Sequence, residues 1–181
     1  MQEQSTVTVS SFWSNLFKTP AERDEIKEVL NTMLPFKDLS SKELDLLLTI
    51  IHNRVYAANE FVFRQGDPGI GLYIIQSGEV AIERKLDEEH KYILTKCVRG
   101  DFFGELALLD DEERSASAIA TKDSKLAVIF KPDLDAFIDK YPKKGIKILR
   151  GLSQIVTTRL RNVNQDFVTL YFQSLNTMKK D

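Results

Sequence analysis

The chain has 181 residues, of which 43% are hydrophobic and 29% charged, and its mean hydropathy is -0.24. These values exclude a large multidomain enzyme and a wholly disordered chain, and they are sufficient for one compact domain with flanking arms. The net charge of -2 excludes binding to nucleic acid or anionic lipid through the field of the whole molecule, so any such contact has to be regional.

The N-terminal segment shows no sign of a targeting or membrane segment. Residues 1–12 are polar and lack periodicity, which predicts a mobile tail, and they lack a basic stretch followed by an apolar run. Nowhere does the chain approach about 18 uninterrupted apolar residues. We therefore expect a soluble cytoplasmic protein without a membrane span.

Two capping boxes predict two N-terminal helices. Thr19 and Glu22 form the first, with Pro20 at the first helical position, and Ser40 and Glu43 form the second. Apolar residues follow each box at helical spacing. They are Ile26, Val29, Leu30 and Met33 in the first helix, and Leu44, Leu47, Leu48 and Ile51 in the second. The tail and the first helix together form an N-terminal arm that is expected to span residues 1–33.

From residue 52 to residue 130 the pattern changes to short apolar or alternating runs separated by turns. The turns fall at 59–60, 77–78, 87–90 and 122–124 and predict antiparallel hairpins between neighbouring strands. A small all-β barrel or sandwich follows. Cys97, the single cysteine, excludes an internal disulfide and is expected to be a small core residue, in keeping with a reducing compartment.

Two helices are expected after the strands. Lys131-Pro132 begins the first and Pro142 begins a long final one. Apolar residues of the final helix alternate in steps of four and three, which is the seam of a coiled coil and predicts a homodimer. The seam residues are Val156, Leu160, Val163, Phe167 and Leu170. Residues 143–181 hold eight Lys or Arg against two Asp, but an apolar seam favours a dimer face over direct DNA binding.

One segment carries groups suited to a phosphate beside a ribose. Gly104 allows close backbone approach, and a helical turn over residues 105–108 would direct free N–H groups at an anion. Arg114 offers a rigid fork of donors that matches phosphate oxygens, and Ser115 adds a neutral donor. Glu105 would repel a phosphate, so it is expected to accept a hydrogen bond from a sugar hydroxyl instead.

The segment FGELALLDDEERSASAIA, residues 103–120, resembles the phosphate-binding cassette of the cyclic nucleotide-binding domain family. The run from Gly66-Asp67-Pro68-Gly69 to Gly78 is similar to that family's first glycine signature. The resemblance covers about residues 34–170. It implies a mainly β fold with flanking helices, namely a jelly roll of the double-stranded β-helix type. The roll and a following B helix would occupy residues 34–142. A C helix in residues 143–181 would serve as the lid over the ligand and as the dimerisation element.

The resemblance also implies a ligand and its contacts. Glu105 would bind the ribose 2′-hydroxyl and Arg114 the cyclic phosphate of cAMP, the favoured ligand, or of cGMP. The C helix would cover the base, with Asn164 the candidate contact. The remaining residues expected at the ligand are Gly104, Leu106, Ala107, Ser115 and Ala116. Unlike the related catabolite activator factors, the chain shows no helix-turn-helix segment, so we expect a regulatory module without catalysis that acts on an unidentified effector protein.

The sequence also admits two other interpretations. A dimerisation or scaffolding protein with a vestigial nucleotide site is the alternative that ligand binding would decide. A cupin-like metalloenzyme needs clustered histidines, and the chain has two, His52 and His90, so no metal is expected. The acidic run at residues 110–113 lacks the spacing of a calcium loop and is expected to be solvated.

Overall fold

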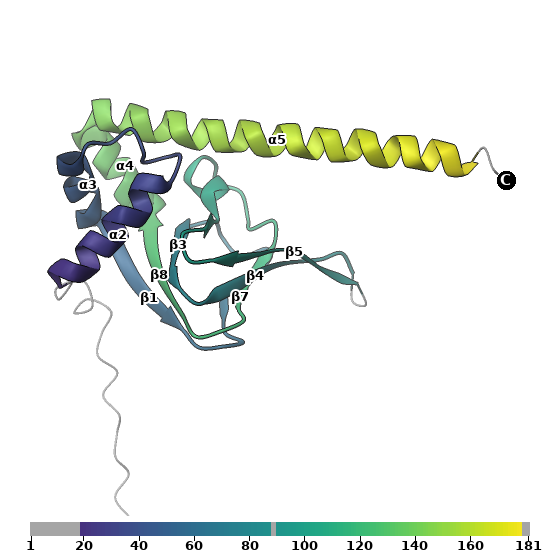
Figure 1. Ribbon diagram of the computed structural model, residues 1–181, viewed down its shortest axis with the longest axis horizontal. Helices are drawn as coiled ribbons and strands as arrows, with labels where there is room; N and C mark the ends of the chain where they lie inside the picture. Colours follow the sequence, from purple (N-terminus) through teal and green to yellow (C-terminus); the bar gives the residue numbers. More distant parts are fainter. Residues whose placement is uncertain (1–18, 88–89, 179–181) are drawn as a thin grey trace, which may run out of the picture.

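The computed structural model describes residues 19–87 and 90–178, which form two antiparallel four-stranded sheets with flanking helices (Figure 1). The predicted tail, residues 1–12, lies outside the described residues. The helices are α2 (Pro20–Thr32), α3 (Ser41–Leu47), α4 (Lys131–Lys140) and α5 (Pro142–Met178), with short 3-10 turns η1 (Leu48–Ile50) and η2 (Glu105–Leu108). The strands are β1 (Ile51–Tyr56), β2 (Phe61–Phe63), β3 (Gly71–Ser77), β4 (Glu79–Lys85), β5 (Lys91–Val98), β6 (Phe102–Phe103), β7 (Ser117–Ala120) and β8 (Ser124–Phe130).

Both predicted capping boxes are confirmed. The Thr19 side chain accepts a hydrogen bond from Glu22 N while the Glu22 carboxylate accepts one from Thr19 N, and Ser40 and Glu43 make the same reciprocal pair. One helical prediction was wrong, because Ile51 is the first residue of β1. Its pairing with Ile129 on β8 takes it out of the helical stripe that Leu44 and Leu47 follow.

The predicted pairing of neighbouring strands holds only for β4 and β5 within the described residues. The sheet orders are β1-β8-β3-β6 and β2-β7-β4-β5, so the turns after β1, β3 and β7 each carry the chain from one sheet to the other. Turn residues report that the chain reverses but not which sheet the next strand joins. The expected fold class, a jelly roll with flanking helices, is confirmed.

The helices close one end of the roll and fix the start of α5. Ile148 and Leu152 of α5 are buried in a core shared with α2, α3, α4 and strands β1, β3 and β8, and Ile155 of the same helix is also buried. A Cβ on Gly151 would lie 2.5 Å from Pro35 Cα, so the two backbones meet in direct contact there. The first part of α5 is therefore held rigidly against the roll.

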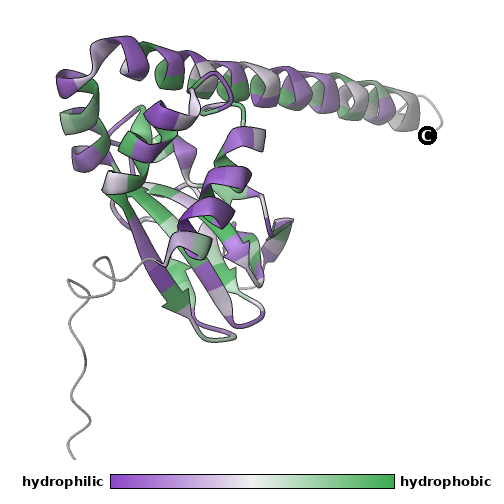
Figure 2. Cartoon of the chain, turned by 60° about the vertical axis from the view of Figure 1, so that its left-hand side comes forward, coloured by the Kyte–Doolittle hydropathy of each residue, from purple (hydrophilic) through white to green (hydrophobic). Residues whose placement is uncertain are grey.

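Beyond Arg159 the helix extends past the roll and its apolar residues are exposed (Figures 1 and 2). Four of the five predicted seam residues are more than half exposed: Leu160, Val163, Phe167 and Leu170. No helix in residues 19–87 and 90–178 combines the length and hydropathy needed to cross a membrane.

Candidate functional site

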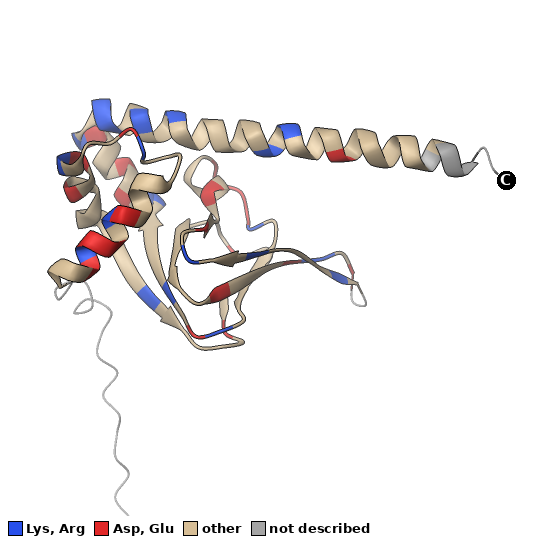
Figure 3. Cartoon of the chain, in the orientation of Figure 1, with Lys and Arg blue, Asp and Glu red and all other residues tan. Residues whose placement is uncertain are grey.

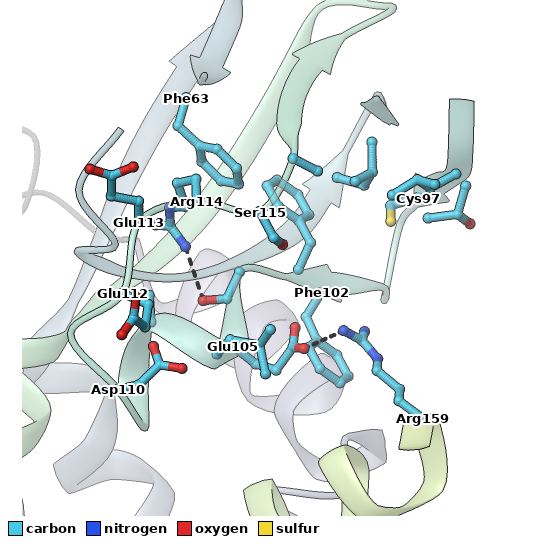
Figure 4. Close-up of a pocket in the computed structure, with 18 residues that line it drawn as sticks. Phe63, Cys97, Phe102, Glu105, Asp110, Glu112, Glu113, Arg114, Ser115 and Arg159 are labelled. Atoms are coloured by element: carbon cyan, nitrogen blue, oxygen red, sulfur yellow. Dashed lines mark hydrogen bonds and ion pairs between the residues drawn. The ribbon is translucent and has the colours of Figure 1, made fainter. Parts of the chain in front are cut away.

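A cavity of about 540 Å³ lies between the second sheet, the η2 turn and α5 (Figure 4). Seven of the eight residues expected at the ligand line it: Gly104, Glu105, Leu106, Ala107, Arg114, Ser115 and Ala116. Strands β4 and β5 contribute Ile82, Thr95 and Cys97 to the opposite wall. A register shift between Ile82 and Glu83 leaves Leu94 as an extra residue of β5, and this side chain also lines the cavity.

Gly104 shapes the floor of the cavity. Its φ of 77° lies in the left-handed region, which a glycine adopts without a Cβ penalty. A Cβ there would lie 2.7 Å from Arg114 Nη1 and 3.0 Å from Gly71 O. The residue at this position therefore has to be glycine both for the turn into η2 and for the close approach of the arginine.

Arg114 is 6% exposed and is oriented by the backbone. Its Nη1 donates to Gly104 O at 3.2 Å and its Nη2 to Gly71 O at 2.9 Å, while the guanidinium lies 4.1 Å from the centre of the Phe63 ring. Burial lowers the pKa of the guanidinium from its usual value. Nε is buried without a hydrogen-bond partner, so one donor of the fork is unused.

Glu105 is 1% exposed and ion-pairs with Arg159 of α5 through Oε1 (Figure 4). Its other oxygen, Oε2, is buried without a partner. Sequence reasoning missed Arg159 as a residue of the site. It lies 54 positions after Glu105, and only the path of α5 over the roll brings the two together. The signal in the sequence that could have identified Arg159 is its position directly before the seam residue Leu160.

Asn164 does not line the cavity and is exposed. It lies five positions after Arg159, which places it about 140° around the helix from the side that faces Glu105. Its role at the base stays a prediction. Cys97 is buried, as expected, and burial raises the pKa of its thiol to about 11, so the thiol is not a ready nucleophile.

The arrangement suits binding and offers no catalytic constellation. An arginine with a free donor can hold an anionic oxygen, and a carboxylate with a free oxygen can accept from a hydroxyl. Across the described part of the chain, no cluster of three His, Cys, Asp or Glu is placed to hold a metal ion. The roll and its cavity are thus suited to a small ligand that bears both an anion and a hydroxyl.

Known proteins agree with this class. Residues 53–141 match the family model of the cyclic nucleotide-binding domain. The cyclic AMP receptor protein of Thermus thermophilus is 34% identical over 138 residues, which is 76% of this chain and 62% of that protein. A cAMP-dependent protein kinase regulatory subunit of Hypocrea atroviridis is 38% identical over 103 residues, 57% of this chain and 20% of that protein.

Solved structures give the same result. A cyclic nucleotide-binding domain from Methylobacillus flagellatus KT aligns with a TM-score of 0.71 and 26% identity over 85% of this chain and 93% of that one. Residues 53–141 therefore belong to the cyclic nucleotide-binding domain family. The chain spans less than two thirds of the length of the two curated relatives, 62% and 20% respectively.

Proposed function

We propose that this chain is a regulatory domain that binds a cyclic mononucleotide in the cavity, with cAMP favoured over cGMP, and that has no catalytic activity of its own. The names of the Thermus and Hypocrea relatives, which refer to cAMP, support this choice of ligand. Arg114 holds the cyclic phosphate and Glu105 accepts a hydrogen bond from the ribose 2′-hydroxyl.

The observation that carries the proposal is the pair of unpartnered buried atoms, Arg114 Nε and Glu105 Oε2. Buried polar atoms in proteins are nearly always hydrogen-bonded, and leaving one unsatisfied costs about 1 to 3 kcal/mol. Both atoms belong to residues that line one cavity, one a donor and one an acceptor. A ligand with an anionic oxygen and a hydroxyl would satisfy both at once.

Helix α5 is proposed to transmit the bound state. Arg159 contacts Glu105 directly, and the next residue, Leu160, belongs to the exposed seam. A ligand that binds Glu105 acts on the carboxylate that Arg159 contacts. The free and the ligand-bound protein therefore differ at α5 itself. The seam is proposed to pair with a second copy, and the shift of α5 to reach an effector protein.

Calorimetric titration with cAMP and, separately, cGMP tests the proposal, after mass spectrometry has shown that no nucleotide co-purified. Arg114→Ala should weaken binding of the favoured nucleotide at least about thirtyfold, the equivalent of about 2 kcal/mol for a charge paired away from water. Arg84→Ala is the matched control, since this arginine is exposed on β4 outside the cavity.

Circular dichroism shows whether Arg114→Ala remains folded, because the change leaves Gly71 O and Gly104 O without their donor. If the folded wild-type protein binds neither nucleotide, the proposed function is wrong and the site is vestigial, which leaves the dimerisation and scaffolding role. If Arg114→Ala binds as tightly as wild type, the assignment of the phosphate to Arg114 is wrong.

A further inference from the structure

The loop between η2 and β7 places three acidic residues at the cavity. Asp110, Glu112 and Glu113 all line it, and all three residues are exposed to solvent. Figure 4 shows them on the side of the cavity next to Arg114, and Figure 3 shows the loop as an acidic stretch directly before this arginine. The side of the cavity that holds the arginine fork therefore carries an excess of negative charge. These three residues are called the acidic rim below.

The acidic rim is held in place at both ends. Lys131 Nζ donates to Asp110 O at 2.8 Å and pairs with the Asp111 carboxylate at 2.5 Å. At the other end Arg114 N donates to Asp67 O at 2.8 Å, and Glu113 forms a β-bridge with Pro68. These contacts hold the backbone of the loop, so the acidic rim is fixed beside the cavity by its main chain.

The charges that line the cavity are unbalanced. Glu105 and Arg159 neutralise each other in their ion pair. This leaves Arg114 as one positive charge against the three carboxylates of the acidic rim. The buried, unpartnered Arg114 Nε and Glu105 Oε2 support a binding site in this cavity independently of the rim.

We propose that the acidic rim is a charge filter, which admits a phosphodiester with one negative charge and rejects monoesters and polyphosphates of the same nucleoside. One negative charge is matched by Arg114, whereas every further charge finds no unpaired cation among the described residues that line the cavity and meets Asp110, Glu112 and Glu113. Selectivity of this kind depends on repulsion of the wrong ligand as much as on attraction of the right one. The inference rests on the proposed function and deepens it.

The size of the effect follows from Coulomb's law. A carboxylate about 10 Å from the phosphate, in water, weakens binding about twofold for each extra charge on the ligand. Three carboxylates together give about eightfold at low salt. Because the Debye length falls from about 30 Å at 0.01 M to about 10 Å at 0.1 M ionic strength, salt removes much of this discrimination.

The test compares wild type with the variant Asp110→Asn/Glu112→Gln/Glu113→Gln. The probes are cAMP, 5′-AMP and ATP, measured by calorimetry and by competition against bound cAMP, without divalent cations, at about 10 mM and about 300 mM salt. The matched control is Asp24→Asn/Glu28→Gln/Asp38→Asn, which removes the same charge from exposed positions outside the cavity.

At low salt the rim variant should bind cAMP, which carries one charge, up to about eightfold more tightly than wild type, while the affinity for 5′-AMP relative to cAMP rises by a further factor of about eight, and more for ATP. The control variant should keep the wild-type ratio. In wild type alone, added salt should raise the 5′-AMP to cAMP affinity ratio, which tests the filter without any substitution.

An unchanged ratio in a rim variant that binds cAMP overturns the filter alone. An equal rise in the control variant also overturns it, because the effect then comes from net charge and not from the rim. If wild type binds neither cAMP nor cGMP, the proposed function falls and this inference falls with it.

Discussion

Replacing Arg159 with Ala should lower the free energy of unfolding by about 2 kcal/mol, because it leaves the carboxylate of Glu105 buried without a cation. The side chain of Glu105 is 1% exposed and that of Arg159 is 52% exposed. Breaking a fully buried pair costs about 3 to 5 kcal/mol and an exposed pair contributes about 0.2 to 1 kcal/mol. A pair with one buried and one half-solvated member falls between these limits.

Urea unfolding of a double-mutant cycle with Glu105→Gln measures this pair. In the Glu105→Gln background, Arg159→Ala should cost less than about 0.5 kcal/mol, since no buried charge is then left behind. Arg161→Ala, an exposed arginine on the same helix, should change stability by less than about 0.5 kcal/mol in either background. Equal losses for Arg159→Ala in both backgrounds would show that the ion pair does not hold α5 to the roll.

Three further predictions concern the turn, the seam and a helix cap. Gly104→Ala should destabilise the fold by at least about 1 to 2 kcal/mol in thermal melts, because alanine is strained at positive φ and its Cβ meets Arg114; a neutral effect would contradict the turn geometry. Phe167→Asp should convert the proposed dimer to a 20.7 kDa monomer in light scattering, and an unchanged mass would exclude the seam as the interface. Glu43→Gln should lower the free energy of unfolding by about 0.5 to 1 kcal/mol at pH 7. The hydrogen bond from Lys147 and that from Ser40 N lower the pKa of Glu43 to about 2, so the difference from wild type should vanish as pH falls from about 4.5 to about 2.

Sequence reasoning succeeded where the signal is local. The capping boxes and the cassette place their functional groups within a few positions of one another, so spacing alone predicts the helix starts. Gly104 and Arg114 are also close in the sequence, and one turn and one loop between them are enough to bring them into contact. Seven of the eight expected ligand residues line one cavity for this reason.

It failed where the outcome depends on packing between distant segments. Which sheet each strand joins depends on pairings such as β1 with β8, and no turn residue encodes them. The two-residue strand β6 is too short to show periodicity. Arg159 joins the site only through the path of α5 over the roll, and the close backbone contact of Gly151 with Pro35 belongs to the packing that holds the start of this helix.

The alternation of strands between the two sheets also constrains how the chain reaches its fold. β1 pairs only with β8 in the described structure, and the register joins Ile51 to Ile129. Such distant pairing requires a large loop to close before its contacts stabilise anything, which slows folding. During synthesis β1 and β3 remain without their shared neighbour until β8 has left the ribosome. Over that interval their unpaired edges are exposed to other chains, so the nascent protein is most at risk of aggregation before its last strand emerges.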